Sequence, residues 1–255
     1  MLGWRLFKHA FLMVLRNFVP ALQIFLVPSI LAFAVIMGVA YATGFLDTFP
    51  VSETDVSSET SPADLGTTVM LTFVVAGTTM LLFVAWTVVA WHRFVLLEEY
   101  PSGWLPPLRT DRVGAYIWRL VILALAAIAM IFPASLLFFV SSAPAIMTPV
   151  VLVYMVFLSI TLTRWSITLP AAAIGKPLTL GEAYAETSGA FGTILVVLLS
   201  GFVLGLLLQG VSWLFIQVPA IYTVWNVPTQ IFTSVLNVSI ITTLYGHYVE
   251  KREID

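Results

Sequence analysis

Residues 188–214 read SGAFGTILVVLLSGFVLGLLLQGVSWL and carry no charged side chain. A helix needs about 20 consecutive apolar residues to cross the roughly 30 Å hydrocarbon core of a bilayer. The apolar residues here are continuous, whereas a strand of a membrane β-barrel alternates apolar and polar residues. A helix also satisfies its backbone hydrogen bonds within the segment. The stretch therefore predicts a transmembrane helix.

Five further segments have the same length and character, at residues 22–44, 67–91, 115–140, 147–169 and 227–249. Only a short run rich in proline and serine, beginning at Ser141, separates the third span from the fourth. That run predicts a tight turn and a helical hairpin. The first apolar run is longer than that of a secretory signal, so we expect an uncleaved span. The predicted fold class is an all-α integral membrane protein with six spans in one domain, residues 19–255.

The composition of the whole chain agrees with this fold class. Hydrophobic residues make up 60% of the 255 residues, charged residues make up 9%, and the mean hydropathy is +1.02. A soluble domain carries about 25% charged residues, so a soluble enzyme is excluded. The net charge of −2 gives no field that would attract nucleic acid. The chain has no cysteine, which removes disulfides, thiolate catalysis and Cys-ligated metals.

The basic residues predict the orientation. If the N-terminus lies in the cytoplasm, all 11 fall on the cytoplasmic side. They precede the first span, occupy the links after the second and fourth spans, or follow the sixth: Arg5, Lys8, Arg16, Arg93, Arg109, Arg112, Arg119, Arg164, Lys176, Lys251 and Arg252. Cytoplasmic loops carry an excess of Lys and Arg. The sequence therefore predicts that both termini are cytoplasmic.

Residues 1–18 form a separate amphipathic segment. Arg5, Lys8 and Arg16 share one side of a helical wheel, and Leu, Phe, Met and Val fill the other. This pattern is typical of a helix in the headgroup plane with its apolar face toward the membrane. We expect its cations to contact anionic lipid headgroups, each contributing about 1 kcal/mol. The helix is interpreted as an anchor for the first span, and a partner-binding or curvature-sensing helix is the alternative.

Two loops lie on the opposite side of the membrane. Residues 45–66 hold five acidic side chains among serines and threonines, which predicts a solvated loop. Residues 215–228 carry no charge and include Trp225, so we expect a loop folded back at the headgroup interface.

The candidate contact residues come from the basic links and the spans. Arg93, Arg119 and Arg164 either belong to a structural belt of ion pairs or form a site for a lipid headgroup. Within the spans the clearest polar groups are neutral, and they include Gln209 and Asn237. Amides at such positions usually bond to another helix, and a substrate site is the alternative.

No motif for hydrolysis or nucleotide binding is present, and no Asp or Glu lies within a span. His9, His92 and His247 show no spacing typical of a metal site and are expected at the membrane interface. We therefore predict no enzymatic activity, no catalytic residue, no metal and no cofactor.

Part of the fourth link resembles a known family. The residues are Arg164, Leu169-Pro170-Ala171, Gly175, Leu180-Gly181-Glu182-Ala183 and Ser188. They resemble the pattern in bacterial proteins related to the membrane domain of glycerophosphoryl diester phosphodiesterase, including uncharacterised stand-alone relatives. The amphipathic start from Trp4 to Asn17 is also similar to that group. The resemblance implies six helices in a bacterial inner membrane and no established activity. It supplies no catalytic residue, because the soluble barrel that performs hydrolysis has no counterpart in this chain.

The expected function is therefore non-catalytic. We expect an accessory, scaffold or lipid-organising protein that contacts membrane lipids and belongs to a larger membrane complex. The alternative is a transporter or flippase for a lipid or another amphiphile, with a cavity open to the cytoplasm and lined by Arg93, Arg119, Arg164, Gln209 or Asn237. A third reading, a lipid-modifying enzyme, requires carboxylates or histidines that converge at one depth.

Overall fold

A computed structural model describes residues 1–48, 62–140 and 144–254, and every regular element in them is helical. The elements are α1 (Leu2–Arg16), α2 (Phe18–Ala42), the 3-10 turn η1 (Phe45–Thr48), α3 (Pro62–Leu97), α4 (Thr110–Val140), α5 (Pro144–Ser166), α6 (Thr168–Ile174), α7 (Leu180–Glu186), α8 (Phe191–Leu214) and α9 (Pro219–Tyr248). Most of the acidic segment 45–66 and the turn that begins at Ser141 lie outside the described residues.

Six of these helices are long and apolar enough to cross a membrane: α2, α3, α4, α5, α8 and α9. The expectation of a multi-pass, all-helical membrane protein is therefore confirmed. Each predicted span coincides with one of these helices, and the largest differences in length are at α3 and α9.

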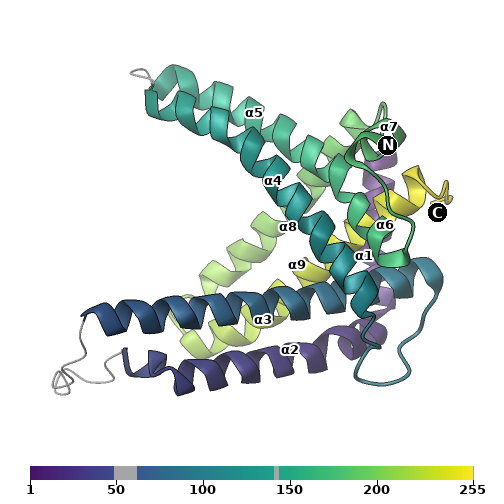
Figure 1. Cartoon of the computed structure of the whole chain (residues 1–255). Coiled ribbons are helices and arrows are strands. Elements are labelled where there is room, and N and C mark those ends of the chain that lie inside the picture. Colours follow the sequence, from purple (N-terminus) through teal and green to yellow (C-terminus); the bar gives the residue numbers. More distant parts are fainter. Residues whose placement is uncertain (49–61, 141–143, 255) are drawn as a thin grey trace.

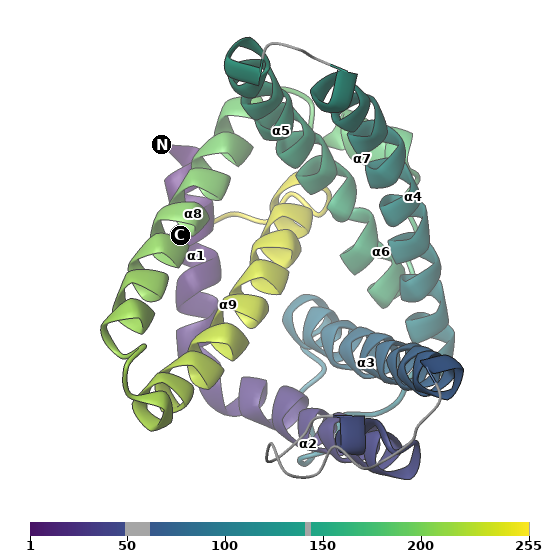
Figure 2. The same ribbon diagram turned by 90° about the vertical axis from the view of Figure 1, so that its left-hand side faces the viewer.

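Three antiparallel pairs, α2 with α3, α4 with α5, and α8 with α9, make up the spanning part (Figure 1). The pairs lie close together at one end of the molecule and diverge toward the other. Seen from the diverging end, they stand at three corners (Figure 2). Both termini lie at the end where the pairs converge, which we call the junction; it comprises α1, α6, α7 and the adjoining ends of the spans.

The main core of the protein lies at the junction. Trp91, Ile167, Ile194 and Tyr245 are almost wholly buried there, whereas large apolar side chains farther along the spans, such as Phe73, are exposed. Burying such a side chain contributes about 1.5–3 kcal/mol when it leaves water. The exposed side chains of the spans meet lipid, which solvates them as well as a protein core does.

Helix α6 is the centre of this core, and it was not predicted from the sequence. All seven of its residues are buried, and it contacts α3, α4, α5 and α9. Ala171, Ala172 and Ala173 let the neighbouring helices approach closely. Gly175 ends the helix with a φ of 82°, a left-handed conformation that costs glycine little. The amide nitrogen of Lys176 then donates to the carbonyl of Ala171 at 2.9 Å, as in a Schellman motif.

Helix α1 is amphipathic, as expected, but its apolar face meets protein. Leu6, Ala10 and Val14 are buried, and α1 packs against α8 and α9. The closest approach is at Gly3, where a Cβ atom would lie 2.5 Å from the carbonyl oxygen of Thr193 and 2.7 Å from Cβ of Val196. The apolar stripe thus docks α1 onto two spans, and its position in the headgroup plane stays a prediction.

The expected loop at residues 215–228 was wrong in most of its length, because α9 begins at Pro219. Proline suits the first turn of a helix, since its missing N–H would have no intrahelical partner there. Pro228, at which the expected loop ended, lies inside α9. A membrane helix tolerates an interior proline when its surroundings satisfy the freed backbone groups.

Candidate functional site

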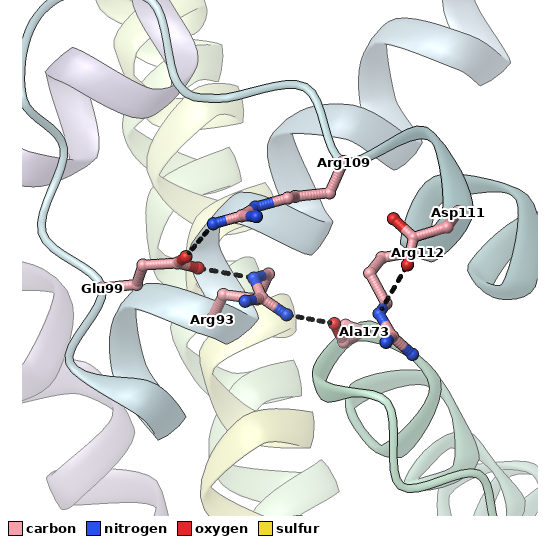
Figure 3. A network of polar contacts seen from close by, with 6 residues as sticks. All are labelled: Arg93, Glu99, Arg109, Asp111, Arg112 and Ala173. Atoms are coloured by element: carbon pink, nitrogen blue, oxygen red, sulfur yellow. Dashed lines mark hydrogen bonds and ion pairs between the residues drawn. The ribbon is translucent and has the colours of Figure 1, made fainter.

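Arg93 lies at the centre of a polar network at the junction (Figure 3). It lies near the end of α3, and Glu99 follows that helix after Glu98, whose φ of 55° turns the chain. Arg93 Nε donates to Oε2 of Glu99 at 2.5 Å, and Arg109 Nη2 donates to Oε1 at 2.5 Å. The hydrogen bond from Arg93 is the main cause that holds the pKa of Glu99 below its ordinary value. Burial opposes it, and Arg109 reinforces it.

The same Arg93 side chain also donates from Nη1 to the carbonyl of Ala173 at 3.2 Å, near the end of α6. Arg112 lies beside it, with its guanidinium against Gly175 and its Nε 3.0 Å from a carboxylate oxygen of Asp111 (Figure 3). Arg93 and Glu99 line a crevice of about 20 Å³. That volume holds about one water molecule, so it is too small for a lipid headgroup.

Arg164 is the most deeply buried arginine in the described chain, with 8% of its surface exposed. Its Nε donates to Thr187 Oγ1 at 2.9 Å, and its Nη2 donates to the carbonyl of Tyr184 at 2.6 Å. The guanidinium carbon lies 3.4 Å from the centre of the Tyr184 ring, a cation–π contact. Within the described residues, Arg164 therefore forms no ion pair and does not belong to the structural belt that was one of its two expected roles. Its guanidinium group instead contacts a hydroxyl, a carbonyl and the face of an aromatic ring.

The C-terminal tail adds further contacts of the same kind. Arg252 donates to the carbonyls of Leu96 at 2.7 Å and Val95 at 3.5 Å, and it pairs with Glu250 at 2.8 Å. Arg5 of α1 donates to the carbonyl of Ile254. Lys176 and Lys251 form ion pairs with Glu250 at 3.5 Å and Glu186 at 3.0 Å.

These contacts share one physical function. The last four carbonyls of a helix have no intrahelical donor and carry partial negative charge. Leu96, Ala173 and Tyr184 lie in the last turns of α3, α6 and α7, and each receives a guanidinium from a different element. Arg93, Arg164 and Arg252 thus cap helices to which they do not belong, and they bind those elements together.

Arg119 completes the trio considered for headgroup binding. It is partly buried on α4, and its charge lies close enough to Glu182 to contribute to the lowered pKa of that carboxylate. The larger causes are the hydrogen bonds from the backbone and side chain of Thr179, which form a capping box with Glu182 at the start of α7. Arg93 contacts Glu99 and Ala173, whereas Arg164 contacts Thr187 and Tyr184, so these two arginines share no partner among the described contacts.

The two intramembrane amides have different surroundings. Asn237 lines a groove of about 380 Å³ between α5, α8 and α9, together with Thr163 and Ser166. Gln209 is exposed on α8. Of the α1 cations, Lys8 and Arg16 are exposed, and Arg5 contacts the tail.

Two buried hydrogen bonds between α3 and α9 were not predicted from the sequence. Trp91 Nε1 donates to Ser239 Oγ at 3.0 Å, and His92 Nδ1 lies 2.8 Å from Thr242 Oγ1. His92 packs within the protein, with 1% of its surface exposed, and its expected position at the membrane interface stays a prediction. In the described part of the chain, no three His, Asp or Glu side chains gather in a group that could hold a metal ion.

Comparison of the chain with protein-family models, with curated proteins and with solved structures found no match. The resemblance of the fourth link to the phosphodiesterase membrane-domain proteins therefore stays a prediction.

Proposed function

We propose that this chain is a non-catalytic, multi-pass protein of a bacterial inner membrane that organises lipids and acts as a scaffold within a larger complex. Both termini lie in the cytoplasm. The observation that carries the proposal is the use of the arginines. Arg93, Arg164 and Arg252 donate to helix carbonyls of the chain itself, and the crevice at Arg93 measures about 20 Å³. The basic groups thus hold three helical pairs in place.

The grooves between the spans support the proposal that the protein binds membrane lipids. Three of them have volumes of about 310–380 Å³ and lie between pairs of spans or beside α1. Such volumes are in the range of ligand sites, about 300–1,000 Å³. Apolar grooves on membrane helices receive acyl chains from the surrounding bilayer.

A pair of measurements on the purified full chain tests this proposal. Native mass spectrometry from mild detergent is expected to show a retained lipid or a stoichiometric protein partner. Vesicles containing the chain and a headgroup-labelled fluorescent phospholipid, quenched from outside by dithionite, are expected to protect as much label as protein-free vesicles. Loss of the protected fraction, together with a lone and lipid-free chain, would overturn the scaffold proposal.

Transport of a lipid or another amphiphile is the second candidate, and one observation favours it. Asn237, Thr163 and Ser166 place polar atoms in one groove within the spans. In the dithionite experiment, transport predicts that the chain exposes the inner leaflet and that Asn237→Leu restores protection. Gln209→Leu is the matched control, because Gln209 lies exposed on α8 and is not among the residues that line this groove.

A further inference from the structure

A large apolar groove lies between α1 and α8. The two helices are in contact at Gly3 and Val196. Beyond that contact a groove of about 700 Å³ opens between Trp4, Lys8 and Leu12 on α1 and the stretch from Val196 to Leu207 on α8. Those α8 residues cover about 16 Å at the rise of an α-helix. The groove is therefore long enough for a large part of an acyl chain.

The lining of the groove combines apolar side chains with a single charged one. Nearly all of the lining side chains are apolar, and Lys8 is the only charged one. The hydroxyl of Ser200 donates to the carbonyl of Val196 at 2.8 Å, so its proton is already used within the helix. Trp4 lies at the groove and is 53% exposed. Indole rings favour the level of the lipid headgroups, since they are apolar and keep one polar N–H.

Lys8 differs from most basic residues of the protein. Arg93, Arg164 and Arg252 donate to carbonyls of the chain. Within residues 1–48, 62–140 and 144–254, no hydrogen bond or ion pair engages Lys8. An ammonium group without a protein partner beside an apolar groove complements a molecule that has an anionic head and an apolar tail.

We infer that this groove binds an anionic phospholipid of the surrounding leaflet, with the phosphate at Lys8 and an acyl chain along Val196 to Leu207. The site deepens the proposed lipid-organising function and rests on it, because it names the class of lipid. The apolar length of the groove holds the chain, and the single cation selects against lipids without net charge. Helix α1 is then fixed to α8 by the lipid as well as by its own apolar face.

The test is native mass spectrometry of the full chain from nanodiscs of equal parts phosphatidylglycerol and phosphatidylcholine. The wild type is expected to retain one phosphatidylglycerol preferentially. Lys8→Gln is expected to lower that preference about fivefold, which corresponds to about 1 kcal/mol for one Lys near an anionic surface. Lys8→Arg is expected to keep it. Arg16→Gln, which removes one charge from the same helix outside the groove, is expected to change it less than twofold.

A second variant, Leu204→Trp, fills the groove without changing the charge, and it is expected to lower retention of both lipids. If Lys8→Gln and Arg16→Gln lower the preference for phosphatidylglycerol equally, the site is overturned, since equal effects indicate an attraction to diffuse surface charge. A preference for phosphatidylglycerol that is unchanged in Lys8→Gln would also overturn the site. So would a bound protein in place of the lipid. Each variant is compared by its thermal midpoint, so that unfolding is recognised. Lipid translocation in vesicles would contradict the proposed function while leaving this site intact, so the two failures are distinguishable.

Discussion

At the scale of single residues, the basic side chains of the junction act as helix caps from outside the helix. Arg93 binds the end of α6, Arg164 binds the end of α7, and Arg252 binds the end of α3. The sequence placed these arginines at helix ends, which the structure bears out. It could not name their partners, because Arg164 lies 23 residues from Thr187, and Arg252 lies 156 residues from Leu96. Such pairings depend on how the helices pack.

Glu99 gives a pH-dependent prediction. Its folded-state pKa is lowered, so its stabilising effect is complete above its unfolded pKa of about 4.5 and is lost as the pH falls through the folded value. We expect Glu99→Gln to lower the free energy of unfolding by about 1 kcal/mol at pH 7. The difference from wild type should vanish at low pH. Thermal unfolding of both proteins in detergent, from pH 7 down to a pH below the folded pKa of Glu99, measures this difference in stability.

Glu98→Gln is the matched control for that prediction, because Glu98 is the exposed neighbour of Glu99. Equal destabilisation by both substitutions, or a difference at Glu99 that persists at low pH, would argue against the ion pairs with Arg93 and Arg109.

Arg164 gives a second prediction at this scale. Lysine keeps the charge but lacks the fork that donates to both Thr187 and the carbonyl of Tyr184. Leaving one buried acceptor without a donor costs about 1–3 kcal/mol. We expect Arg164→Lys to be destabilised by about 2 kcal/mol in detergent unfolding. Arg109→Lys, at a side chain that is 48% exposed, should change stability little, and a similar loss in both would refute the geometric explanation.

At the scale of elements, features that depend on a single segment could be predicted from the sequence. Features that depend on packing between distant segments could not. The spans were predictable because apolar length is a property of one segment. The capping box of Thr179 and Glu182 was predictable because it joins residues three positions apart. Helix α6 was not predictable, since its alanines are ordinary in sequence and become informative only when α3, α4 and α9 surround them. The start of α9 was missed because the uncharged residues 215–228 were interpreted as a loop at the headgroup interface.

The docking of α1 on α8 gives a prediction at Gly3. A methyl group there would meet the carbonyl of Thr193 and the side chain of Val196. Overpacking of this kind costs about 1–3 kcal/mol, so Gly3→Ala should release α1. Hydrogen exchange measured by mass spectrometry should then rise across residues 2–16. Gly38→Ala is the control, because nothing lies within 4 Å of a Cβ at that position. Increased exchange of α1 in the control as well would contradict the contact.

At the scale of the whole molecule, the helices are closely packed at one end, and apolar side chains are exposed toward the other. The buried side chains gather where α1, α6 and the ends of the spans meet. The three pairs diverge from that end (Figure 1). Hydropathy and charge predicted the number of spans and which ends share a side of the membrane. They could not predict the divergence, because lipid satisfies an exposed apolar face as well as another helix does.

The cytoplasmic placement of the junction is the claim on which the proposed function and the leaflet of the lipid site depend. The chain has no native cysteine, so single cysteines can report it without interference. Ser57→Cys in the acidic segment and Ser102→Cys and Ser188→Cys in the basic links are treated with a membrane-impermeant maleimide on intact bacterial spheroplasts. We predict labelling at position 57 without permeabilisation, and labelling at 102 and 188 only after it. Labelling of 102 and 188 in intact spheroplasts would contradict the orientation.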